Sequence, residues 1–583
     1  MKSLWTDKVD LSMPLSEHPR PQFRRDCWQC LNGEYEYHIA TRGEKWISDY
    51  SEKITVPFAI ESMLSGVEKP FKPTDRLWYQ KKFTVSDELK GKNILLHFDA
   101  VDWQCKVYIN KELVGTHSGG YCAFYFDITK YLTDGENTLN VCVYDPTESG
   151  WQQRGKQDNH PHGFWYTATS GIWQTVWLEG VNENRIESIK LLPDIDKGEF
   201  NIKTKITANE YDFIKLTVLD GENEVLSKNI EADENVALGD GFKLWSPEEP
   251  NLYDIKLELS VKSEIVDTVM SYFGMRKFNI EKDKFGVVRL FLNNQPYFQR
   301  GLLDQGYWPD GGLTPPTDEA MIFDIAEMKR LGFNMLRKHI KVEPMRWYYH
   351  CDRLGMIVWQ DMISGGAYIG NLYAGVMPNI TPHLKDDKYN IFNRERKEAR
   401  DDYKRELGEM IEQLYNVVSI YCWVPFNEGW GQFDALKICN YVKSLDSSRV
   451  VDHASGWYDQ GGGDIKSMHR YVFPVTMPKL DNKRAFVITE FGGYQNTYTG
   501  HTWTENKTFG LYLKFKNKQT LTNAYRKLYE KQIIPLIDKG LSGTVYTQVS
   551  DVENELNGIY TYDRVHLKID EDVIKDINKK LKL

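Results

Sequence analysis

The sequence lacks any uninterrupted apolar run of the roughly 20 residues that a membrane-spanning helix requires. It also lacks an excess of basic residues, since 73 Lys and Arg stand against 83 Asp and Glu and the formal net charge is −10. Proteins that bind nucleic acids usually carry a basic surface. The first residues, MKSLWTDKVDLSMPL, contain no apolar h-region of a signal peptide. We therefore expect neither a membrane nor a nucleic acid as partner, and a cytoplasmic location unless an exported form has been trimmed.

Cysteine is scarce and dispersed, with eight residues along the chain. Cys27 and Cys30 have the spacing of a redox or zinc pair, but no second pair follows and no βαβ pattern surrounds them. We expect ordinary thiols. Aromatic residues, in contrast, make up 13% of the chain, with 17 Trp and 34 Tyr. Such side chains stack on sugars and bases, but they also fill β-rich cores, and we expect core packing to explain most of them.

The length of the chain, 583 residues, is too great for one hydrophobic core and predicts several domains. Residues 1–185 contain segments that alternate apolar and polar residues with period two, separated by turn signals such as TDGEN. This pattern is typical of an antiparallel β-sandwich. Residues 186–283 continue as short strands and predict a second, smaller sandwich.

In residues 284–583 short apolar runs alternate with helical patterns, as in successive βα units. One helix is predicted over 317–332, with Thr317 as its N-cap and Gly332 at its C-terminal stop. Eight strand-plus-helix units in about 300 residues are what a (β/α)₈ barrel requires. The predicted strands are residues 297–301, 334–339, 356–361, 419–428, 449–455, 465–471, 486–491 and 543–549.

Two glutamates are placed at strand ends by this prediction. Glu428 ends the fourth strand and Glu490 the seventh, so both are expected at the C-terminal mouth of the barrel, where the active sites of such barrels lie. A protonated carboxyl and an ionised carboxylate about 5–5.5 Å apart can cleave a glycosidic bond with retention of configuration. Repulsion and burial would separate the two pKa values. Spacing alone leaves open that each glutamate only pairs with an Arg or Lys of the barrel rim.

Motifs spread over nearly the whole chain resemble those of glycoside hydrolase family 2. Four segments are similar to the sugar-binding domain of that family, namely RPQFRRDCWQCLNGEYEY, ITVPFAIESMLSGV, LWYQKKFTV and TSGIWQTVWLEG. Two segments, LWSPEEPNLYDIKLEL and FGMRKF, are similar to the end of its immunoglobulin-like domain. Its barrel is resembled by four further segments, namely NNQPYFQRG, EMKRLGFNMLRKH, WYYHCDRLGMIVWQD and YTQVSDVENELNGIYTYDR. The resemblance implies an N-terminal jelly-roll β-sandwich, an immunoglobulin-like β-sandwich and a C-terminal (β/α)₈ TIM barrel.

The resemblance also implies roles for individual residues. Glu428, in an Asn-Glu pair, matches the general acid/base of the family, and Glu490, in ITEFG, matches the nucleophile. Asn427 would hydrogen-bond the sugar 2-hydroxyl, a contact that strengthens in the transition state. Tyr471, in SMHRY, matches a tyrosine that donates to the nucleophile, and Arg337, in NMLRKH, matches an arginine close to it.

The sequence departs from the family pattern near the first three barrel strands. Many members carry a histidine three residues after the strand arginine, where this chain has Ile340, so that His339 is a candidate for substrate contact. The first strand continues as GLLDQGYWPDGG instead of the histidine-containing loop common in the family. VWQDM resembles the mannosidase branch more than the galactosidase branch. The further residues expected to line the sugar pocket are Asp304, Gln305, Trp308 and Asp361.

Two other family features are missing from the sequence. Glucuronidases of the family read the substrate carboxylate with an Asn-x-Lys pair, but no lysine follows two residues after Asn557, which disfavours glucuronidase activity. Some galactosidases of the family use Mg²⁺, but no His/Glu cluster with ligand spacing precedes Glu428, so that we expect no metal. The long loop 149–171 of the first domain, rich in Trp, His and Gln, is predicted to reach over the barrel mouth.

The function expected from these residues and this resemblance is that of a retaining, exo-acting β-glycosidase. β-Galactosides are the favoured substrates, because that activity is the commonest in the family. A β-mannosidase, or a β-glycosidase acting on another sugar such as a galacturonide, is the alternative within enzymes. A non-catalytic carbohydrate-binding protein is the alternative outside them, although it would lack one of the two carboxylates. Family members are often dimers or tetramers, so a homo-oligomer is also expected.

Overall fold

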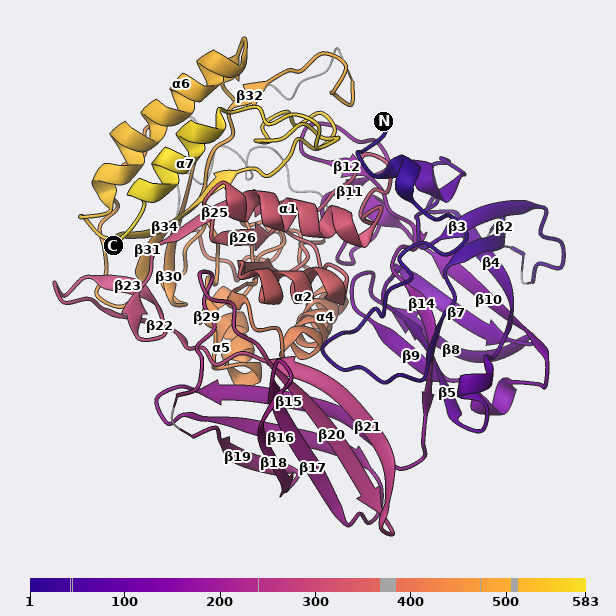
Figure 1. The fold of residues 1–583 in the computed structure, drawn as a ribbon. Helices are drawn as coiled ribbons and strands as arrows, with labels where there is room; N and C mark the ends of the chain where they lie inside the picture. The colour runs from indigo at the N-terminus through magenta and orange to yellow at the C-terminus, as the bar shows by residue number, and fades with distance from the viewer. Residues whose placement is uncertain (42, 45, 240, 367–383, 472, 505–511) are drawn as a thin grey trace.

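A computed structural model describes residues 1–583 except 42, 45, 240, 367–383, 472 and 505–511. Two antiparallel β-sandwiches come first in the chain, and an eight-stranded parallel barrel with its helices follows. In Figure 1 the first sandwich lies to the right, the second below, and the barrel fills the upper left. The predicted fold class is therefore confirmed.

The first sandwich has two main sheets that enclose one apolar core, to which Tyr79, Leu96 and Val141 belong. Its four-stranded sheet consists, in spatial order, of β1 (Trp28–Cys30), β14 (Val176–Val181), β5 (Asn93–Phe98) and β9 (Phe124–Asp127). Its six-stranded sheet consists of β3 (Glu52–Val56), β2 (Gly33–Thr41), β4 (Asp75–Thr84), β10 (Glu136–Tyr144), β7 (Gln104–Ile109) and β8 (Glu112–Ser118). Short pairs are formed by β6 (Val101–Asp102) with β13 (Gly171–Ile172), and by β11 (Gln157–Asp158) with β12 (Tyr166–Thr167).

The second sandwich packs a three-stranded sheet against a four-stranded one around Phe200, Leu216 and Leu257. The first consists of β15 (Arg185–Asp194), β16 (Glu199–Thr207) and β19 (Asp233–Ala237). The second consists of β18 (Asn223–Ile230), β17 (Phe213–Asp220), β20 (Tyr253–Val261) and β21 (Glu264–Phe273).

A small sheet joins the second sandwich to the barrel. It is formed by β22 (Phe278–Lys282), β23 (Val288–Leu292) and β24 (Gln295–Pro296). Phe278 and Leu290 belong to the same apolar cluster as Met335 and Val487 of the barrel, so this sheet covers one end of the barrel. The predicted domain boundary 185/186 falls in β15 and the boundary 283/284 between β22 and β23; the division itself stays a prediction.

Each of the eight predicted strand segments overlaps one strand of the barrel. In spatial order these are β29 (Val450–Val451), β28 (Ile420–Val424), β27 (Ile357–Asp361), β26 (Met335–Lys338), β25 (Gln299–Asp304), β34 (Leu541–Thr547), β31 (Ala485–Gly492) and β30 (Ile465–Arg470). A hydrogen bond of 2.8 Å from the Asp464 N–H to the Val451 carbonyl links β30 back to β29. The barrel is thereby nearly closed.

Helices surround the barrel in the part of the chain that the structure describes. They are α1 (Asp318–Arg330), α2 (Met345–Leu354), α4 (Lys397–Leu414), α5 (Ala435–Leu445), α6 (Lys518–Leu528) and α7 (Glu571–Lys580). Thr317 is the N-cap of α1, as predicted, since its side chain accepts a hydrogen bond of 3.2 Å from the Ala320 N–H. A short two-stranded sheet, β32 (Gln495–Asn496) with β33 (Lys514–Phe515), precedes α6.

Side chains of the barrel strands alternate between two apolar regions. Leu303, Met335 and Trp359 face the barrel interior, where they share one cluster. Leu302 and Leu336 are the sequence neighbours of Leu303 and Met335. They belong to a second apolar cluster, in which they pack against the surrounding helices. The period of two in a strand therefore decides which residues can reach the open mouth and which lie behind the strands.

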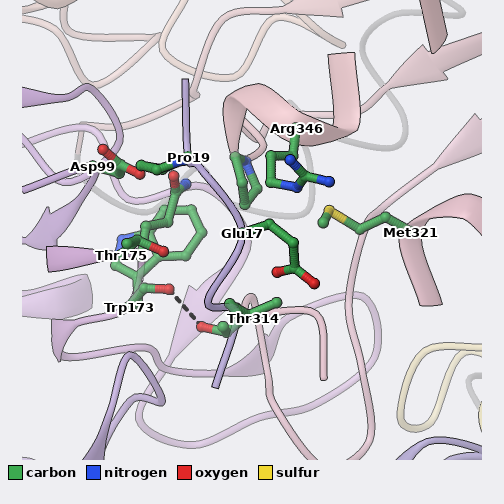
Figure 2. Close-up of a pocket in the computed structure, with 11 residues that line it drawn as sticks. Glu17, Pro19, Asp99, Trp173, Thr175, Thr314, Met321 and Arg346 are labelled. Atoms are coloured by element: carbon green, nitrogen blue, oxygen red, sulfur yellow. Dashed lines mark hydrogen bonds between the residues drawn. The ribbon is translucent and has the colours of Figure 1, made fainter. Parts of the chain in front are cut away.

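The first sandwich is packed directly against the barrel. The Thr314 hydroxyl, in the segment between β25 and α1, donates a hydrogen bond of 2.6 Å to the Trp173 carbonyl of the sandwich. Glu17 and Pro19 of the N-terminal segment pass between the two units, beside Arg346 of α2 (Figure 2). The cavity left there is only about 20 Å³, the size of a water molecule. The sandwich can therefore hold its loops in a defined place on the barrel.

Candidate active site

Several barrel strands bring polar side chains to one end of the barrel. β26 carries Arg337, β27 ends at Asp361 and β31 carries Glu490. Hydrogen bonds and ion pairs connect these residues with side chains that follow β28 and with side chains on and just after β30. We call the connected set the mouth cluster; it comprises Arg337, Asp361, Asn427, Glu428, His469, Tyr471 and Glu490.

Arg337 lies at the centre of the mouth cluster and is fully buried. Its guanidinium binds Asp361 in a bidentate manner, with Nε–Oδ1 and Nη2–Oδ2 distances of 2.9 and 3.0 Å. Nη1 donates to Glu490 Oε1 at 3.1 Å, and Nη2 donates to Asn427 Oδ1 at 2.8 Å. The last contact turns the amide nitrogen of Asn427 away from the arginine. One cation thus fixes the positions of three predicted site residues.

Glu490 is surrounded by donors. Besides Arg337 on Oε1, the Tyr471 hydroxyl donates to Oε2 at 2.5 Å, and His469 Nδ1 lies 3.5 Å from Oε2. Burial alone would raise the pKa of Glu490. The electrostatic influence of His469 and Arg337, with the hydrogen bond from Tyr471, outweighs burial and holds the pKa below its ordinary value. Glu490 is therefore ionised near neutral pH, which is the form that a nucleophile requires.

Glu428 has the opposite electrostatic character. Burial and the nearby charge of Glu490 raise its pKa, although a hydrogen bond from His469 and the charge of Lys156 oppose them. The Glu428 side chain keeps 26% of its surface exposed to the mouth, which moderates the effect of burial. A carboxyl with a raised pKa beside an ionised one can donate a proton at neutral pH.

The backbone places Glu428 in an unusual conformation. Its φ angle is +51°, in the left-handed region that residues other than glycine rarely adopt. The Glu428 N–H donates to the Ser455 carbonyl at 3.0 Å, and the Ser455 N–H donates to the Phe426 carbonyl at 2.8 Å. The segment after β29 thereby holds the turn in place. Strained backbone that neighbouring structure maintains in this way is frequent at functional sites.

The two glutamates lie close to each other across the mouth. One carboxylate oxygen of Glu428, one of Glu490 and one nitrogen of His469 all lie within 4.8 Å of one another. This upper limit is close to the separation of about 5–5.5 Å at which a second carboxylate can attack the anomeric carbon directly. It leaves too little room for the water molecule that inverting enzymes place between their carboxyl groups.

His469 is the member of the mouth cluster that the sequence analysis missed. Its Nδ1 lies 2.8 Å from Glu428 Oε1, and its Nε2 lies 3.4 Å from Nη1 of Arg337. The Nδ1 of His469 faces Glu428 and donates the hydrogen bond to it. The signal was available, because His469 precedes Tyr471 by two residues and side chains two apart in a strand share a face.

His339 lies at the edge of the mouth cluster, two residues after Arg337 and on the same side. Its Nδ1 lies 2.8 Å from Asp361 Oδ2. Burial and the charge of Lys156 lower the pKa of His339 well below its ordinary value, so it is neutral at pH 7 and donates to Asp361. Its role as a substrate contact stays a prediction.

The three residues predicted after the first strand are buried and are not members of the mouth cluster. Asp304 faces away from the barrel interior and forms a buried ion pair of 2.8 Å with Lys338. Gln305 follows it and is also buried. Trp308 lines a cavity of about 180 Å³ between the first sandwich and the barrel, together with Tyr307, Thr167 and Glu553. Contact of these three predicted residues with a sugar stays a prediction.

Loop 149–171 reaches the barrel mouth, as predicted. The Arg154 and Gly155 N–H groups donate to the Ser364 carbonyl after β27, at 3.1 and 3.0 Å. The rings of Trp165 and Trp430 lie 4.7 Å apart in edge-to-face geometry, and Trp430 is two residues after Glu428. The loop thus touches the barrel segments that follow two neighbouring strands.

The same loop also touches the segment after β34. The Thr167 N–H donates to Glu553 Oε1 at 2.8 Å, and the Tyr166 hydroxyl donates to Glu555. Tyr512 donates to the other oxygen of Glu555 at 3.1 Å, and its ring lies 5.1 Å from that of Tyr471. The first sandwich therefore forms one wall of the mouth.

A metal ion has one candidate position among the described residues, namely Glu428, His469 and Glu490. The atoms of this group already bond to one another, to Arg337 and to Tyr471. An ion bound there would occupy both carboxylates that the chemistry above requires. The described part of the structure thus offers no separate set of metal ligands, and the expectation that the protein uses no metal stays a prediction.

Comparisons with known proteins place the chain among the carbohydrate-active enzymes. Residues 44–180 match the model "Glycosyl hydrolases family 2, sugar binding domain", residues 184–276 match "Glycosyl hydrolases family 2", and residues 289–539 match "Glycosyl hydrolases family 2, TIM barrel domain". The three matches occur in the order that the resemblance implied. The chain belongs to glycoside hydrolase family 2.

Individual relatives agree with this family. A β-galactosidase of Thermoanaerobacter pseudethanolicus is 27% identical over 441 residues, which cover 72% of this chain and 54% of the relative. The chain thus spans about half the length of the curated relatives it matches. A β-D-glucuronidase of Dictyoglomus thermophilum has a TM-score of 0.74 at 16% identity, with 97% and 98% of the two chains covered. A β-galacturonidase of Eisenbergiella tayi has a TM-score of 0.71 at 19% identity, with 97% and 99% covered.

Among the described residues, no helix combines the length and the apolar character that crossing a membrane requires.

Proposed function

We propose that this protein is a retaining, exo-acting β-glycosidase in which Glu490 is the nucleophile and Glu428 the general acid/base. The observation that supports this most strongly is the pair itself. Oxygens of the two carboxylates lie within 4.8 Å of each other, while the pKa of one is raised and that of the other lowered. Family membership adds that related chains with this domain order hydrolyse glycosides.

In the first step a Glu490 oxygen attacks the anomeric carbon as the bond from that carbon to the leaving oxygen breaks. Glu428 gives its proton to the leaving oxygen, so that the aglycone departs as a neutral alcohol. His469 donates to Glu428 Oε1, so Oε2 is the oxygen left to carry this proton. Asn427, whose amide nitrogen is turned away from Arg337, donates to the sugar 2-hydroxyl.

In the second step Glu428 acts as a base. Once Glu490 forms an ester with the sugar it is neutral, and the charge that raised the pKa of Glu428 is gone. Glu428 then accepts a proton from water, which attacks the anomeric carbon and releases Glu490 as a carboxylate. Two inversions at the same carbon retain its configuration. The hydrogen bonds from Arg337 and Tyr471 stabilise Glu490 as a leaving carboxylate.

The sugar we propose has the galacto configuration. The support is that the first four curated relatives by sequence are β-galactosidases, at 25–27% identity. The glucuronidase and galacturonidase structures are below 20% identical and support only the fold. A panel of nitrophenyl β-glycosides, namely galactoside, glucoside, mannoside and glucuronide, tests this choice, and a mannoside preference would contradict it.

The nucleophile assignment predicts the effect of Glu490→Ala. Turnover of the preferred nitrophenyl glycoside should fall by about 10³-fold or more, because the covalent intermediate can no longer form. Added azide should attack the vacated face of the sugar and yield the α-glycosyl azide. In the matched variant Glu428→Ala the nucleophile is still present, and azide should yield the β-glycosyl azide instead. The anomer is read by proton NMR, and equal products from both variants would contradict the two roles.

A further inference from the structure

Lys156, in loop 149–171 of the first sandwich, is a second cation at the mouth that the mechanism above does not use. Its charge lowers the pKa values of Glu428 and His339, so its ammonium lies near the mouth cluster. The contacts that locate it are with aromatic rings: Nζ lies 5.7 Å from the centre of the Tyr166 ring and 5.9 Å from that of Phe164. Lys156 is only partly buried and can meet a ligand.

The position of Lys156 is well defined by its neighbours in the loop. The Tyr166 N–H donates to the Lys156 carbonyl at 2.8 Å, which joins the two halves of the loop. The two residues before it, Arg154 and Gly155, are hydrogen-bonded to Ser364 of the barrel. The Arg154 guanidinium lies over the Trp165 ring at 5.1 Å and near Trp430. The lysine is thus carried on a segment that both the sandwich and the barrel hold.

Among the described residues, the charges of the mouth are paired with one another and not with Lys156. Arg337 is matched by Asp361 and Glu490. Glu555 accepts hydrogen bonds from Tyr166, Tyr512 and Asn557. Over the part of the chain that the structure describes, Lys156 forms no ion pair within 4 Å. A half-buried ammonium that has no ion-pair partner has lost part of its hydration, and an anion from outside the protein would compensate for that loss.

We infer that Lys156 binds an acidic substituent of the saccharide, either the carboxylate of a uronic acid or a sulfate ester. This inference rests on the proposed β-glycosidase function, because it places the acidic group on a sugar bound next to Glu428. Lys156 then determines specificity. Lys156 differs in this from the Asn-x-Lys pair of the glucuronidases, which is missing after β34 in this chain. Lys156 also belongs to the first sandwich and not to the barrel.

The experiment compares three nitrophenyl β-glycosides of galacto configuration, namely the neutral galactoside, the galacturonide and the 6-sulfogalactoside. The quantity measured is the ratio of kcat/KM for each acidic substrate to kcat/KM for the neutral one. Lys156→Met should lower this ratio by about 100-fold, since removal of one partner of a hydrogen-bonded charge pair is costly. The two acidic substrates distinguish carboxylate from sulfate recognition. Added NaCl should raise KM for the acidic substrate in the parent and less in the variant.

Two further variants control this comparison. Lys156→Arg keeps the charge and should keep the ratio within about tenfold of the parent, whereas loss of loop structure would abolish activity on all three substrates. Lys106→Met removes an exposed lysine of β7 in the same sandwich and should leave the ratio unchanged. An equal loss on acidic and neutral substrates in Lys156→Met, with correct folding by circular dichroism, would overturn the inference.

A binding measurement distinguishes failure of this inference from failure of the proposed glycosidase function. If no glycoside is hydrolysed, binding of D-galacturonate and D-galactose is measured by calorimetry on the parent and on Lys156→Met. Tighter binding of galacturonate that is lost in the variant supports the role of Lys156 even in a protein without turnover. Equal binding of both sugars by the parent contradicts it.

Discussion

Arg337 and Lys338 are neighbours on β26, yet they belong to two different charge clusters. Arg337 faces the barrel interior and is part of the mouth cluster. Lys338 faces the other way and binds Asp304 at 2.8 Å and Glu343 at 2.7 Å. Lys341 also binds Glu343, at 2.8 Å. We call Lys338, Asp304, Glu343 and Lys341 the rear cluster.

The two clusters use the same chemistry but differ in access. In the rear cluster every side chain is at most 3% exposed, so its charges can only stabilise one another. In the mouth cluster Arg337 is equally buried, but Glu428 keeps 26% of its side chain exposed. Buried pairs of cation and carboxylate are therefore not a sign of catalysis by themselves. The distinguishing feature is one carboxylate that is linked to the network and still open to a ligand.

The comparison is tested most strongly by Arg337→Met. This change leaves Glu490 and Asp361 without their shared cation and removes an influence that lowers the pKa of Glu490. We expect kcat/KM on the preferred nitrophenyl glycoside to fall by about 10³-fold or more, which corresponds to about 4 kcal/mol. Arg337→Lys should recover only part of the activity, because an ammonium cannot make the bidentate contact with Asp361. Activity within tenfold of the parent would show that the cluster is not organised by this arginine.

Lys338→Met should instead act on stability. It leaves Asp304 without a cation in a dry environment, and we expect the free energy of unfolding to fall by about 3 kcal/mol in urea denaturation. kcat/KM of the folded protein should change much less than in Arg337→Met. The double variant Lys338→Met/Asp304→Asn should regain part of the lost stability, because the uncompensated charge is removed. A stable Lys338→Met protein without activity would mean that the rear cluster is coupled to the mouth.

The same alternation explains what could be predicted from the sequence. Eight apolar segments separated by helical patterns predicted the barrel, because strand burial depends on local residue type and period. The prediction that Asp304 lines the sugar pocket rests on its place in the segment after the first predicted strand. Yet Leu303 points into the barrel, so the next residue must point out of it, and parity assigns Asp304 to the rear. His339 illustrates the converse, since it shares the parity of Arg337 and lies beside Asp361.

Other parts of the site could not be predicted from local pattern. Lys156 comes from a loop of another domain, 179 residues before Met335, the first residue of β26. Its place depends on how the sandwich packs on the barrel. Trp308 follows a strand end where the chain turns, so parity no longer applies, and it lines a cavity between the sandwich and the barrel. Interdomain packing involves side chains far apart in the sequence, and no periodicity reports on it.

The smallest of the expected effects is a shift in pH dependence when His469 is changed. His469 lowers the pKa values of both Glu428 and Glu490. In His469→Phe both values should rise. The acidic limb of kcat/KM, which requires ionised Glu490, and the basic limb, which requires protonated Glu428, should then move to higher pH together, by about one unit.

Matched variants distinguish this electrostatic role of His469 from a role in packing. His469→Asn places an amide donor near the position of Nδ1 and should keep the hydrogen bond to Glu428, so its basic limb should shift less than that of His469→Phe. A simple loss of packing would lower activity at all pH values without moving either limb. Movement of the acidic limb alone would mean that His469 acts on Glu490 and not on Glu428. In that case His469 would influence only the nucleophile Glu490. The hydrogen bond from His469 would then not decide which oxygen of Glu428 carries the proton.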